Sequence, residues 1–538
     1  MRSLWLDTHP ITLPNTAGSD GALGSISPAS FTPGTHYDAV VAGAGITGLT
    51  TAVLLSRAGK KVVVVEARSI GAVATGNTTA KVSLLQGTML SGIRSHQDDE
   101  TLRAYVEGNR EAQAWLLHYL DEREVPYQRR TAYTYATTEQ GQNSLEKELE
   151  ACRTAGLDVA WTEDTELPFP VTGALALPNQ AQIHPMTVLE ALVSELDERG
   201  GTVFEGVRVT DATPDGGNTQ DDAGPLTVET TAGALHADQL VLATGAPILD
   251  RGGYFAKLKG NRSYALTYRL PAEARADIPQ GMYLSADSPS RTTRTVPMPQ
   301  GTGDGGEELL LVGGNDHVVG RPGPEGLDAE SHQAAVDDLE AWTQEHFPGA
   351  ERTHVWAAQD YRASAYVPYI GALPRGGGNI YVATGFNKWG MTNGVAAALA
   401  ISSEILHRDN GTDGTMPWAK TLMDTSVTAS GLLTGVKDNL EVGAHMVTDW
   451  AKAELRNLPG EAPAEGQGIV GRRDGRPVAV STVDGTTCAL SAVCPHMGGI
   501  LTWNDAERSW DCPLHASRFS HDGTLLEGPA VDGLKPMD

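Results

Sequence analysis

The chain has 538 residues, enough for two or three domains with full hydrophobic cores. Its formal net charge is −27, so a nucleic-acid backbone or an anionic membrane would repel it. Four cysteines are too few for a disulfide-rich scaffold, and we expect Cys152 and Cys488 to be free buried thiols. These features predict a cytoplasmic protein with neither a nucleic-acid nor a membrane partner.

The N-terminal segment, residues 1–35, has no basic region followed by an apolar core and is therefore unlike a signal peptide. Its content of Pro, Gly, Ser and Thr predicts an extended arm. The longest apolar stretch, residues 395–401, is far too short to cross a bilayer.

A nucleotide-binding unit is predicted next. Residues 37–42 are typical of a short apolar strand, 49–58 of an amphipathic helix and 61–65 of a β-branched strand. The turn between the first strand and the helix has the pattern GxGxxG at 43–48. Its glycines let the backbone approach a pyrophosphate, and the helix N-terminus supplies partial positive charge. Glu66 ends the second strand, where it can accept hydrogen bonds from an adenosine ribose.

The number of such turns decides between the possible dinucleotides. No second GxGxxG follows a predicted strand elsewhere in the chain. A flavin reductase supplied by NAD(P)H usually needs two dinucleotide sites. The single N-terminal site therefore favours FAD, with electrons coming from the substrate itself.

The middle of the chain alternates between helical and strand-like segments. Helices are predicted at 98–121, 187–199 and 393–406, strands at 202–211, 226–242, 263–270, 308–313 and 379–383, a glycine-bearing loop at 384–392, an amphipathic helical segment at 431–455 and a linker at 457–467.

Two Cys-His pairs, Cys494-Pro495-His496 and Cys512-Pro513-Leu514-His515, occupy the C-terminal region. A Rieske [2Fe–2S] cluster needs two such pairs, because one iron binds two thiolates and the other binds two imidazoles. Zinc also binds Cys and His, but zinc fingers favour pairs of like residues at short spacing. The pattern therefore predicts a Rieske cluster with ligands Cys494, His496, Cys512 and His515.

The neighbours of these ligands bear on the cluster potential. Rieske domains of respiratory complexes resemble this segment but carry two further cysteines, which form a disulfide beside the cluster; Gly499 and Leu514 stand at those positions here. Ser517 is kept as a donor to a cluster sulfur, whereas Phe519 replaces a tyrosine. Fewer hydrogen bonds to sulfur stabilise the reduced cluster less, so we expect a low-to-middle Rieske potential.

Three segments resemble the FAD-dependent oxidoreductases of the D-amino-acid oxidase (DAO) superfamily, and more narrowly the subgroup with a C-terminal Rieske domain. They are 43–48 with Glu66, 75–81 and 383–392, and the resemblance runs from about residue 36 to the end. It implies an α/β + β fold: a Rossmann-like FAD-binding domain, an interleaved β-rich substrate domain and a small all-β Rieske domain. The expected parts are an arm at 1–35, FAD-binding and substrate domains at 36–410 (substrate part mainly 90–185 and 254–370), a connecting helical segment at 411–457 and a Rieske domain at 458–538.

The resemblance also implies which residues meet FAD. Segment 78–81 should line the flavin, and segment 385–392 should pass its pyrimidine edge, where N–H groups and a helix start stabilise charge on the reduced ring. Val209 should meet the adenine through its backbone. No cysteine stands where relatives attach FAD covalently, so we expect non-covalent FAD. The expected set is Gly43, Gly45, Ile46, Thr47, Gly48, Glu66, Ala67, Arg68, Thr78, Thr79, Ala80, Lys81, Val209, Thr244, Gly245, Gly385, Gly390, Met391 and Thr392.

The chemistry implied by the resemblance is hydride transfer to flavin from a C–H next to an amine nitrogen, giving an imine that hydrolyses. A neutral amine can lose hydride directly, so placement against the ring is the main catalytic task. We expect Lys81 and Trp389 at the reacting centre. Candidates for a substrate carboxylate are Arg262, Arg291, Arg294 and Arg321, with Tyr264, Tyr361 and Tyr369 as wall or lid residues.

These expectations combine into an FAD enzyme that oxidises an amine or amino-acid-like substrate and sends electrons through the Rieske cluster to an acceptor protein. Two alternatives stay open: a flavin oxidase that reduces O₂ directly with an accessory Rieske domain, and a flavin or Rieske monooxygenase-type enzyme. A Rieske oxygenase needs a second iron on two histidines and a carboxylate, and the other histidines lack the close helical spacing for it. A flavin hydroxylase would carry Gly-Asp where this chain has Gly385-Phe386.

Overall fold

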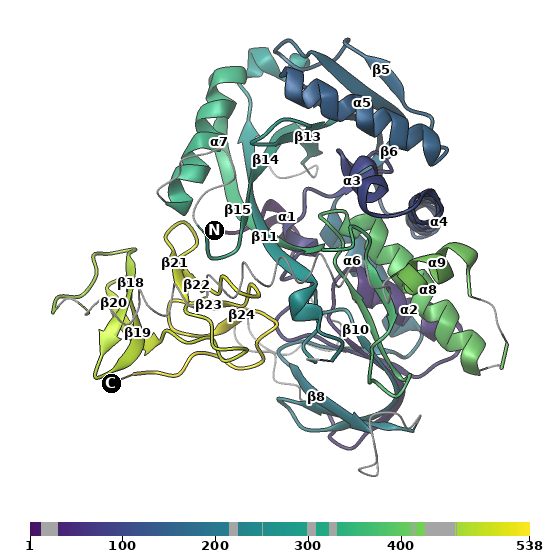
Figure 1. Ribbon diagram of the computed structural model, residues 1–538, viewed down its shortest axis with the longest axis vertical. Coiled ribbons are helices and arrows are strands. Elements are labelled where there is room, and N and C mark those ends of the chain that lie inside the picture. Colours follow the sequence, from purple (N-terminus) through teal and green to yellow (C-terminus); the bar gives the residue numbers. More distant parts are fainter. Residues whose placement is uncertain are drawn as a thin grey trace.

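The structure is a computed structural model that describes residues 1–11, 31–214, 224–249, 251–298, 308–321, 331–409, 411–412, 415–425, 458 and 460–537 (Figure 1). The predicted amphipathic segment at 431–455 lies outside these residues. No helix in the described part of the chain has the length and apolar character needed to span a bilayer.

An eight-stranded sheet forms the nucleotide-binding half, with strand order β16-β17-β10-β1-β2-β7 and with β9 pairing β10 and β8. Strands β1, β2, β7, β10 and β17 are parallel. All four residues of β2 are valines and all are buried, as is typical of a parallel strand covered on both faces. The strands are β1 (His36–Ala42), β2 (Val62–Val65), β7 (Thr202–Phe204), β8 (Val209–Pro214), β9 (Leu226–Thr230), β10 (Leu235–Leu242), β16 (Tyr369–Ala372) and β17 (Ile380–Thr384).

Helices cover this sheet (Figure 1), and α2 packs against both α6 and α8. Helix α4 packs against α8 and α9. The nucleotide-binding strands and most predicted helices occur where the periodicity placed them, within a few residues. The helices are α2 (Ile46–Arg57), α4 (Asp99–Glu122), α6 (Pro185–Glu198), α8 (Gly390–Asp409) and α9 (Pro417–Thr425).

A nine-stranded, largely antiparallel sheet forms the second half, with strand order β15-β11-β14-β13-β12-β4-β6-β3 and β5 pairing β6. Strands β11 and β15 pair along nearly their whole length, from Leu258 opposite Ala363 to Arg269 opposite Glu351. In Figure 1 these two strands run from the upper sheet down toward the C-terminal domain. The elements are β3 (Lys81–Val82), α3 (Met89–His96), β4 (Tyr127–Ala136), α5 (Glu139–Thr154), β5 (Ala160–Thr162), β6 (Gly173–Ile183), β11 (Leu258–Arg269), β12 (Met282–Ser285), β13 (Arg291–Pro297), β14 (Glu308–Val318), α7 (His332–His346) and β15 (Glu351–Ala363).

The C-terminal domain, yellow in Figure 1, consists of a three-stranded and a four-stranded antiparallel sheet. Trp510 and Phe519 are fully buried in its core, together with Cys494 and Cys512. Its strands are β18 (Gly468–Arg473), β19 (Arg476–Val483), β20 (Thr486–Ser491), β21 (Thr502–Asn504), β22 (Ser509–Asp511), β23 (Arg518–Ser520) and β24 (Leu525–Glu527).

The expectation of an extended N-terminal arm is wrong for its first residues. Leu4–Thr8 is a short helix, α1, capped by Ser3. Leu4 and Trp5 are buried, because they pack into the main core rather than lying in solvent. Composition predicted an arm, but two apolar side chains with a core to enter decide the local structure here.

Candidate functional site

The glycine turn of the nucleotide-binding unit has no room for side chains. Gly43 has a φ of +108°, and a Cβ added there would lie 2.5 Å from the carbonyl oxygen of Ala243. A Cβ added at Gly48 would lie 1.9 Å from the carbonyl oxygen of Gly43. The turn therefore depends on glycine for its conformation and for the close packing of β1, β10 and α2.

The Glu66 carboxylate is held by two backbone hydrogen bonds at the end of β2. Its two carboxylate oxygens accept hydrogen bonds from the backbone N–H of Ala44 (2.9 Å) and of Arg68 (2.8 Å). Burial raises the pKa of Glu66, and these two N–H groups oppose that shift. Each oxygen keeps a further lone pair, which a ribose hydroxyl could use.

A cavity of about 1160 Å³ opens from the glycine turn into the space between the two large sheets. Nearly every residue expected to bind FAD lines it, as does Trp389; the exceptions are Gly48, Ala80 and Thr392. Gly48 lies beneath the turn, against Gly43, and Thr392 lies within α8, where it accepts a hydrogen bond from Gln86. The cavity volume and the glycine turn fit FAD, whose binding by these individual residues stays a prediction.

The loop 76–80 is held by its carbonyl oxygens. The carbonyl of Gly76 accepts from Ser3, that of Asn77 from the Trp356 indole (2.8 Å) and that of Thr78 from the Trp5 indole (2.7 Å). The carbonyls of Thr79 and Ala80 both accept from Arg294, each at 2.8 Å. Five consecutive carbonyls are thus fixed by α1, β13 and β15. Sequence reasoning missed Ser3, Trp5 and Trp356, because no local pattern links them to this loop.

A second loop, 385–389, carries an unusual backbone conformation. Gly385, Asn387 and Lys388 all have positive φ, which is uncommon for lysine. The Asn387 side chain accepts from the Ala363 N–H (2.9 Å) and donates to the Tyr366 carbonyl (3.1 Å). These bonds tie the loop to the end of β15 and direct the N-terminus of α8 at the cavity, where it favours negative charge.

A buried polar network supports the start of α8. Tyr105 donates to Gln86 (2.6 Å) and accepts from Asn393 (2.9 Å), while Asn109 donates to Asn393 (3.0 Å). Gln86 in turn donates to Thr392 (3.2 Å). Because α4 and α8 share these bonds, the position of α8 relative to the cavity is fixed by side chains as well as by apolar packing.

Lys81 lies in the cavity wall with only 7% of its surface exposed. Its Nζ donates to the Tyr283 carbonyl (2.6 Å) and contacts the Thr292 hydroxyl. Burial lowers the pKa of Lys81 to about 7, and the nearby Arg294 guanidinium acts in the same direction.

Three of the four arginines considered for a substrate carboxylate do not line the cavity. Arg262 pairs with Glu507 and Glu527, and Arg294 binds the 76–80 loop. Arg291 pairs with Asp338 (2.6 Å) and donates to Asn315 (2.7 Å). Arg321 does line the cavity, as do Tyr264 and Tyr361, whereas Tyr369 does not.

The two Cys-His loops place like ligands together. The Cys494 and Cys512 thiols are within hydrogen-bonding contact, and the His496 and His515 rings lie with centroids 5.1 Å apart. Within the described ranges, no three Cys, His, Asp or Glu side chains converge as a single metal ion would require. A sulfur pair beside an imidazole pair fits a two-iron Rieske cluster.

The cluster loops also form part of the cavity wall. Pro513, Leu514 and Ala516 line the same cavity as the FAD turn, with Leu526, Glu527 and Gly528. A Cβ added at Gly260 of β11 would lie 2.2 Å from the Ala516 Cβ, so the strand and the cluster loop are in tight contact. A smaller neighbouring cavity is lined by His496 and His515 on one side and by Phe255 and Tyr361 on the other.

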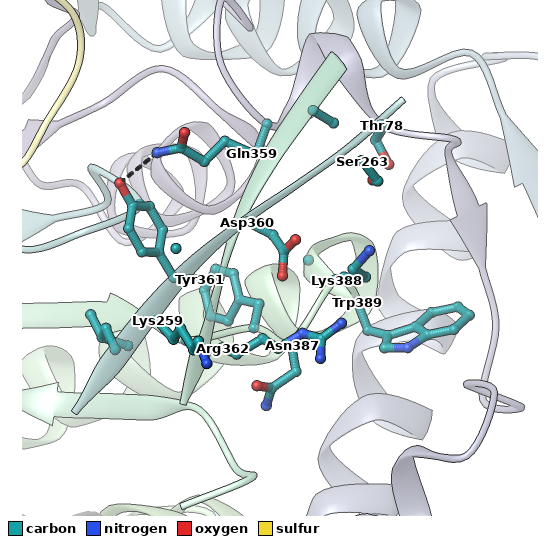
Figure 2. Close-up of a pocket in the computed structure, with 18 of the residues that line it drawn as sticks. Thr78, Lys259, Ser263, Gln359, Asp360, Tyr361, Arg362, Asn387, Lys388 and Trp389 are labelled. Carbon is teal, nitrogen blue, oxygen red and sulfur yellow. Dashed lines mark hydrogen bonds between the residues drawn. The ribbon is translucent and has the colours of Figure 1, made fainter. Parts of the chain in front are cut away.

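Two residues of β15, Gln359 and Tyr361, hold the cluster loops in place. Gln359 donates to the Ala516 carbonyl (2.9 Å) and to the Tyr361 hydroxyl (2.9 Å), the bond drawn in Figure 2. Tyr361 donates to the Gly528 carbonyl (3.0 Å). Tyr361 therefore lies between the cavity and the loop region that carries the cluster histidines.

A buried ion network joins the Rieske domain to β11. Arg262 contacts Glu507 (2.5 Å) and Glu527 (2.9 Å). Arg518 contacts the same two carboxylates and Asp511, each at 2.9 Å. All five side chains are nearly inaccessible, so each charge depends on the others for compensation.

Comparison with known proteins agrees with both halves of this site. Residues 38–403 match the family described as FAD dependent oxidoreductase, and residues 457–538 match the Rieske [2Fe-2S] domain. The Bacillus subtilis (strain 168) iron-sulfur protein YhfW, whose name assigns it a Rieske 2Fe-2S centre, is 30% identical over 512 residues, covering 94% of each chain.

Solved structures share the fold of the larger part. L-proline dehydrogenase from P. horikoshii superposes with a TM-score of 0.54 at 16% identity, covering 73% of this chain and 98% of its own. Glycine oxidase from Geobacillus kaustophilus superposes with a TM-score of 0.54 at 18% identity, covering 72% of this chain and 98% of its own. At these identities the likeness concerns the fold.

Proposed function

Because the chain belongs to the FAD-dependent oxidoreductase (DAO) family and carries a Rieske [2Fe–2S] domain, we propose that it oxidises the C–N bond of an amine or amino-acid-like substrate and passes the electrons through the Rieske cluster. The names of the structural neighbours, a proline dehydrogenase and a glycine oxidase, support a substrate of this class. An acceptor protein completes the proposed route.

One observation carries the electron-transfer part of the proposal: a single cavity is lined both by the FAD turn and by the Rieske loop 513–516. When bound, FAD supplies two-electron hydride acceptance and the cluster supplies one-electron transfer. The chain's own contribution is to hold the two sites in contact, through Gln359, Tyr361 and the ion network around Arg262. Fixed packing of this kind keeps the distance between two bound groups constant.

The residues near the reacting centre have roles under this proposal. The buried Lys81 amine, with its pKa lowered to about 7, holds its position by donating to Tyr283 and Thr292. Trp389 precedes α8 in the cavity wall and excludes water from it. The N–H groups at the start of α8 face the place where negative charge would develop.

Anaerobic mixing of the purified holoenzyme with a panel of amines and amino acids tests the proposal. Flavin bleaching and cluster reduction are followed together by visible absorbance and electron paramagnetic resonance. We expect one substrate class to reduce both centres in sequence. Flavin bleaching with the cluster left oxidised would favour a direct oxidase, and reduction only by an external reductant would refute a dehydrogenase.

A matched pair of cysteine variants gives the control. Cys512→Ser removes a cluster ligand and should abolish the cluster signal while substrate still bleaches the flavin. Cys488→Ser changes a free thiol in β20 and should leave both signals intact. If both variants lost the cluster equally, Cys512 would not be a specific ligand.

A further inference from the structure

Asp360 in the cavity wall has a carboxylate oxygen without a hydrogen-bond donor. Asp360 lies in β15, lines the cavity and points into it in Figure 2. Its Oδ2 atom is buried, and within the described residues no group donates a hydrogen bond to it. A buried carboxylate oxygen without a donor is costly, and a bound ligand that donates a hydrogen bond to it would remove that cost.

The positive charges nearest to Asp360 are committed elsewhere. Lys388 pairs with Asp316 at 2.6 Å, and Arg362 pairs with the same carboxylate. Neither forms an ion pair with Asp360, although Lys388 and Arg362 act against the effect of burial, which raises the pKa of Asp360 to about 6.

A second aspartate in the same cavity shows the contrast. Asp287 also lines the cavity, but its carboxylate accepts from the Thr137 N–H (2.7 Å), the Thr137 hydroxyl (3.0 Å) and the Thr138 hydroxyl. Its hydrogen-bonding capacity is used by the protein. Asp360 differs because its Oδ2 atom accepts no hydrogen bond from the described residues.

Three cations considered for this region are already bonded to protein groups. Lys81 is occupied by Tyr283 and Thr292, and Arg291 and Arg294 are bonded outside the cavity lining. The unsatisfied Asp360 atom is a carboxylate oxygen, so a ligand complementary to it carries N–H donors and positive charge. Charge-assisted N–H to carboxylate bonds are about twice as strong as neutral ones.

We propose that Asp360 is the anchor for a cationic nitrogen group of the substrate, so that the part of the cavity around Asp360 favours alkylammonium groups over carboxylates. This inference rests on the proposed function, since it takes the cavity as the substrate site. A site built to hydrogen-bond one group rejects analogues that lack it, because its own polar atom is then left unpaired.

Equilibrium binding to the holoenzyme tests the assignment with three probes of similar shape: tert-butylammonium, pivalate and tert-butanol. None has a hydrogen on the carbon next to its polar group, or an oxidisable amine C–H, so turnover does not interfere. By calorimetry we expect the wild type to bind the cation at least tenfold more tightly than the anion. Asp360→Asn should remove that preference while leaving tert-butanol affinity unchanged.

Two further variants keep the test decisive. Asp287→Asn should retain the preference for the cation, because that carboxylate is already satisfied, and Asp360→Glu should retain part of it. FAD content and melting temperature verify that each variant is folded. Equal or tighter binding of pivalate by the wild type, or an unchanged preference in Asp360→Asn, would overturn the inference. A protein that binds the cation but is reduced by no amine would refute the proposed function alone.

Discussion

The two walls of the cavity are built in different ways. The nucleotide wall consists of short contiguous segments, 43–48, 76–80 and 385–390, whose backbone approaches the cavity. The opposite wall, which we call the side-chain wall, consists of side chains from β11, β15 and the Rieske loops. Hydrogen bonds bring together residues of this wall that are more than 150 positions apart in the sequence. The shape of the nucleotide wall depends on positions that have no side chain. The shape of the opposite wall depends on contacts made by specific side chains.

The largest expected effect on cofactor binding tests the nucleotide wall. In Gly48→Ala the added methyl group would lie 1.9 Å from the Gly43 carbonyl oxygen, so the backbone must move and the turn cannot keep its shape. We expect loss of FAD from the purified protein, a decrease in affinity of at least about tenfold, equivalent to ~1.4 kcal/mol. FAD absorbance per polypeptide measures it.

Gly460→Ala is the matched control, because a Cβ added there meets no atom within 4 Å. It should retain the wild-type amount of FAD. A Gly48→Ala protein that also retains full FAD would show that the tight turn is not what holds the dinucleotide.

This contrast explains what the sequence could predict. The GxGxxG turn with Glu66 and the Cys-His pairs are local patterns, so the nucleotide sheet, the cofactors and the ligand pairs follow from neighbouring residues. The helix at Leu4–Thr8, the indole bonds from Trp5 and Trp356, and the role of Arg294 depend on tertiary contacts. Arginine in a β-rich domain suggested a substrate carboxylate, whereas Arg262 and Arg294 fix protein loops.

Asp360 was missed for the same reason. It is one charged residue in a strand, without a motif around it, and only the pairing of Lys388 and Arg362 with Asp316 leaves it unsatisfied. Alternation along β15 gives a partial signal, because Gln359 and Tyr361 bind the Rieske loops while Asp360 points into the cavity. The alternation identifies Asp360 as a cavity residue only when the position of β15 between the two domains is known.

The largest expected effect on stability tests the side-chain wall. Arg262→Met leaves Glu507 and Glu527 with one fewer buried cation, and breaking such a network costs about 3–5 kcal/mol. We expect a marked fall in the free energy of unfolding, measured by denaturant titration. Arg352→Met in β15 breaks an exposed pair with Glu340 and should cost about 0–1 kcal/mol. Equal losses in the two variants would contradict a special role for the interface network.

The pH dependence of stability tests Lys81, which stands where the two walls meet. Its pKa is about 7 in the folded protein, below the ordinary value of 10.5, so the unfolded chain binds more protons between these values. The contribution of Lys81 to the free energy of unfolding therefore rises as the pH increases from about 7 to 10.5, and it is lowest below pH 7. Lys81→Met should stabilise the protein by up to about 5 kcal/mol at pH 6, less the value of its two hydrogen bonds, and the difference should shrink toward pH 10.

Thermal unfolding at several pH values gives this measurement. Lys147→Met replaces an exposed lysine that also lines the cavity and should leave the pH profile unchanged. A constant difference between Lys81→Met and the wild type across pH 6–10 would mean that burial does not disfavour the charged Lys81 amine.

The smallest effect concerns one hydroxyl group within the side-chain wall. Tyr361→Phe keeps the ring but removes the hydroxyl that bonds Gly528 and Gln359, a loss of about 0.5–1.5 kcal/mol in stability. Flavin reduction by substrate should keep its rate, because the nucleotide wall is unaltered, whereas reoxidation of the flavin by the cluster should slow as the Rieske loops loosen. Stopped-flow absorbance separates the two steps. Tyr366→Phe, an exposed ring at the cavity rim, should alter neither. Slowing of both steps by Tyr361→Phe would instead place its hydroxyl at the reacting centre, and the two walls would then share one catalytic residue.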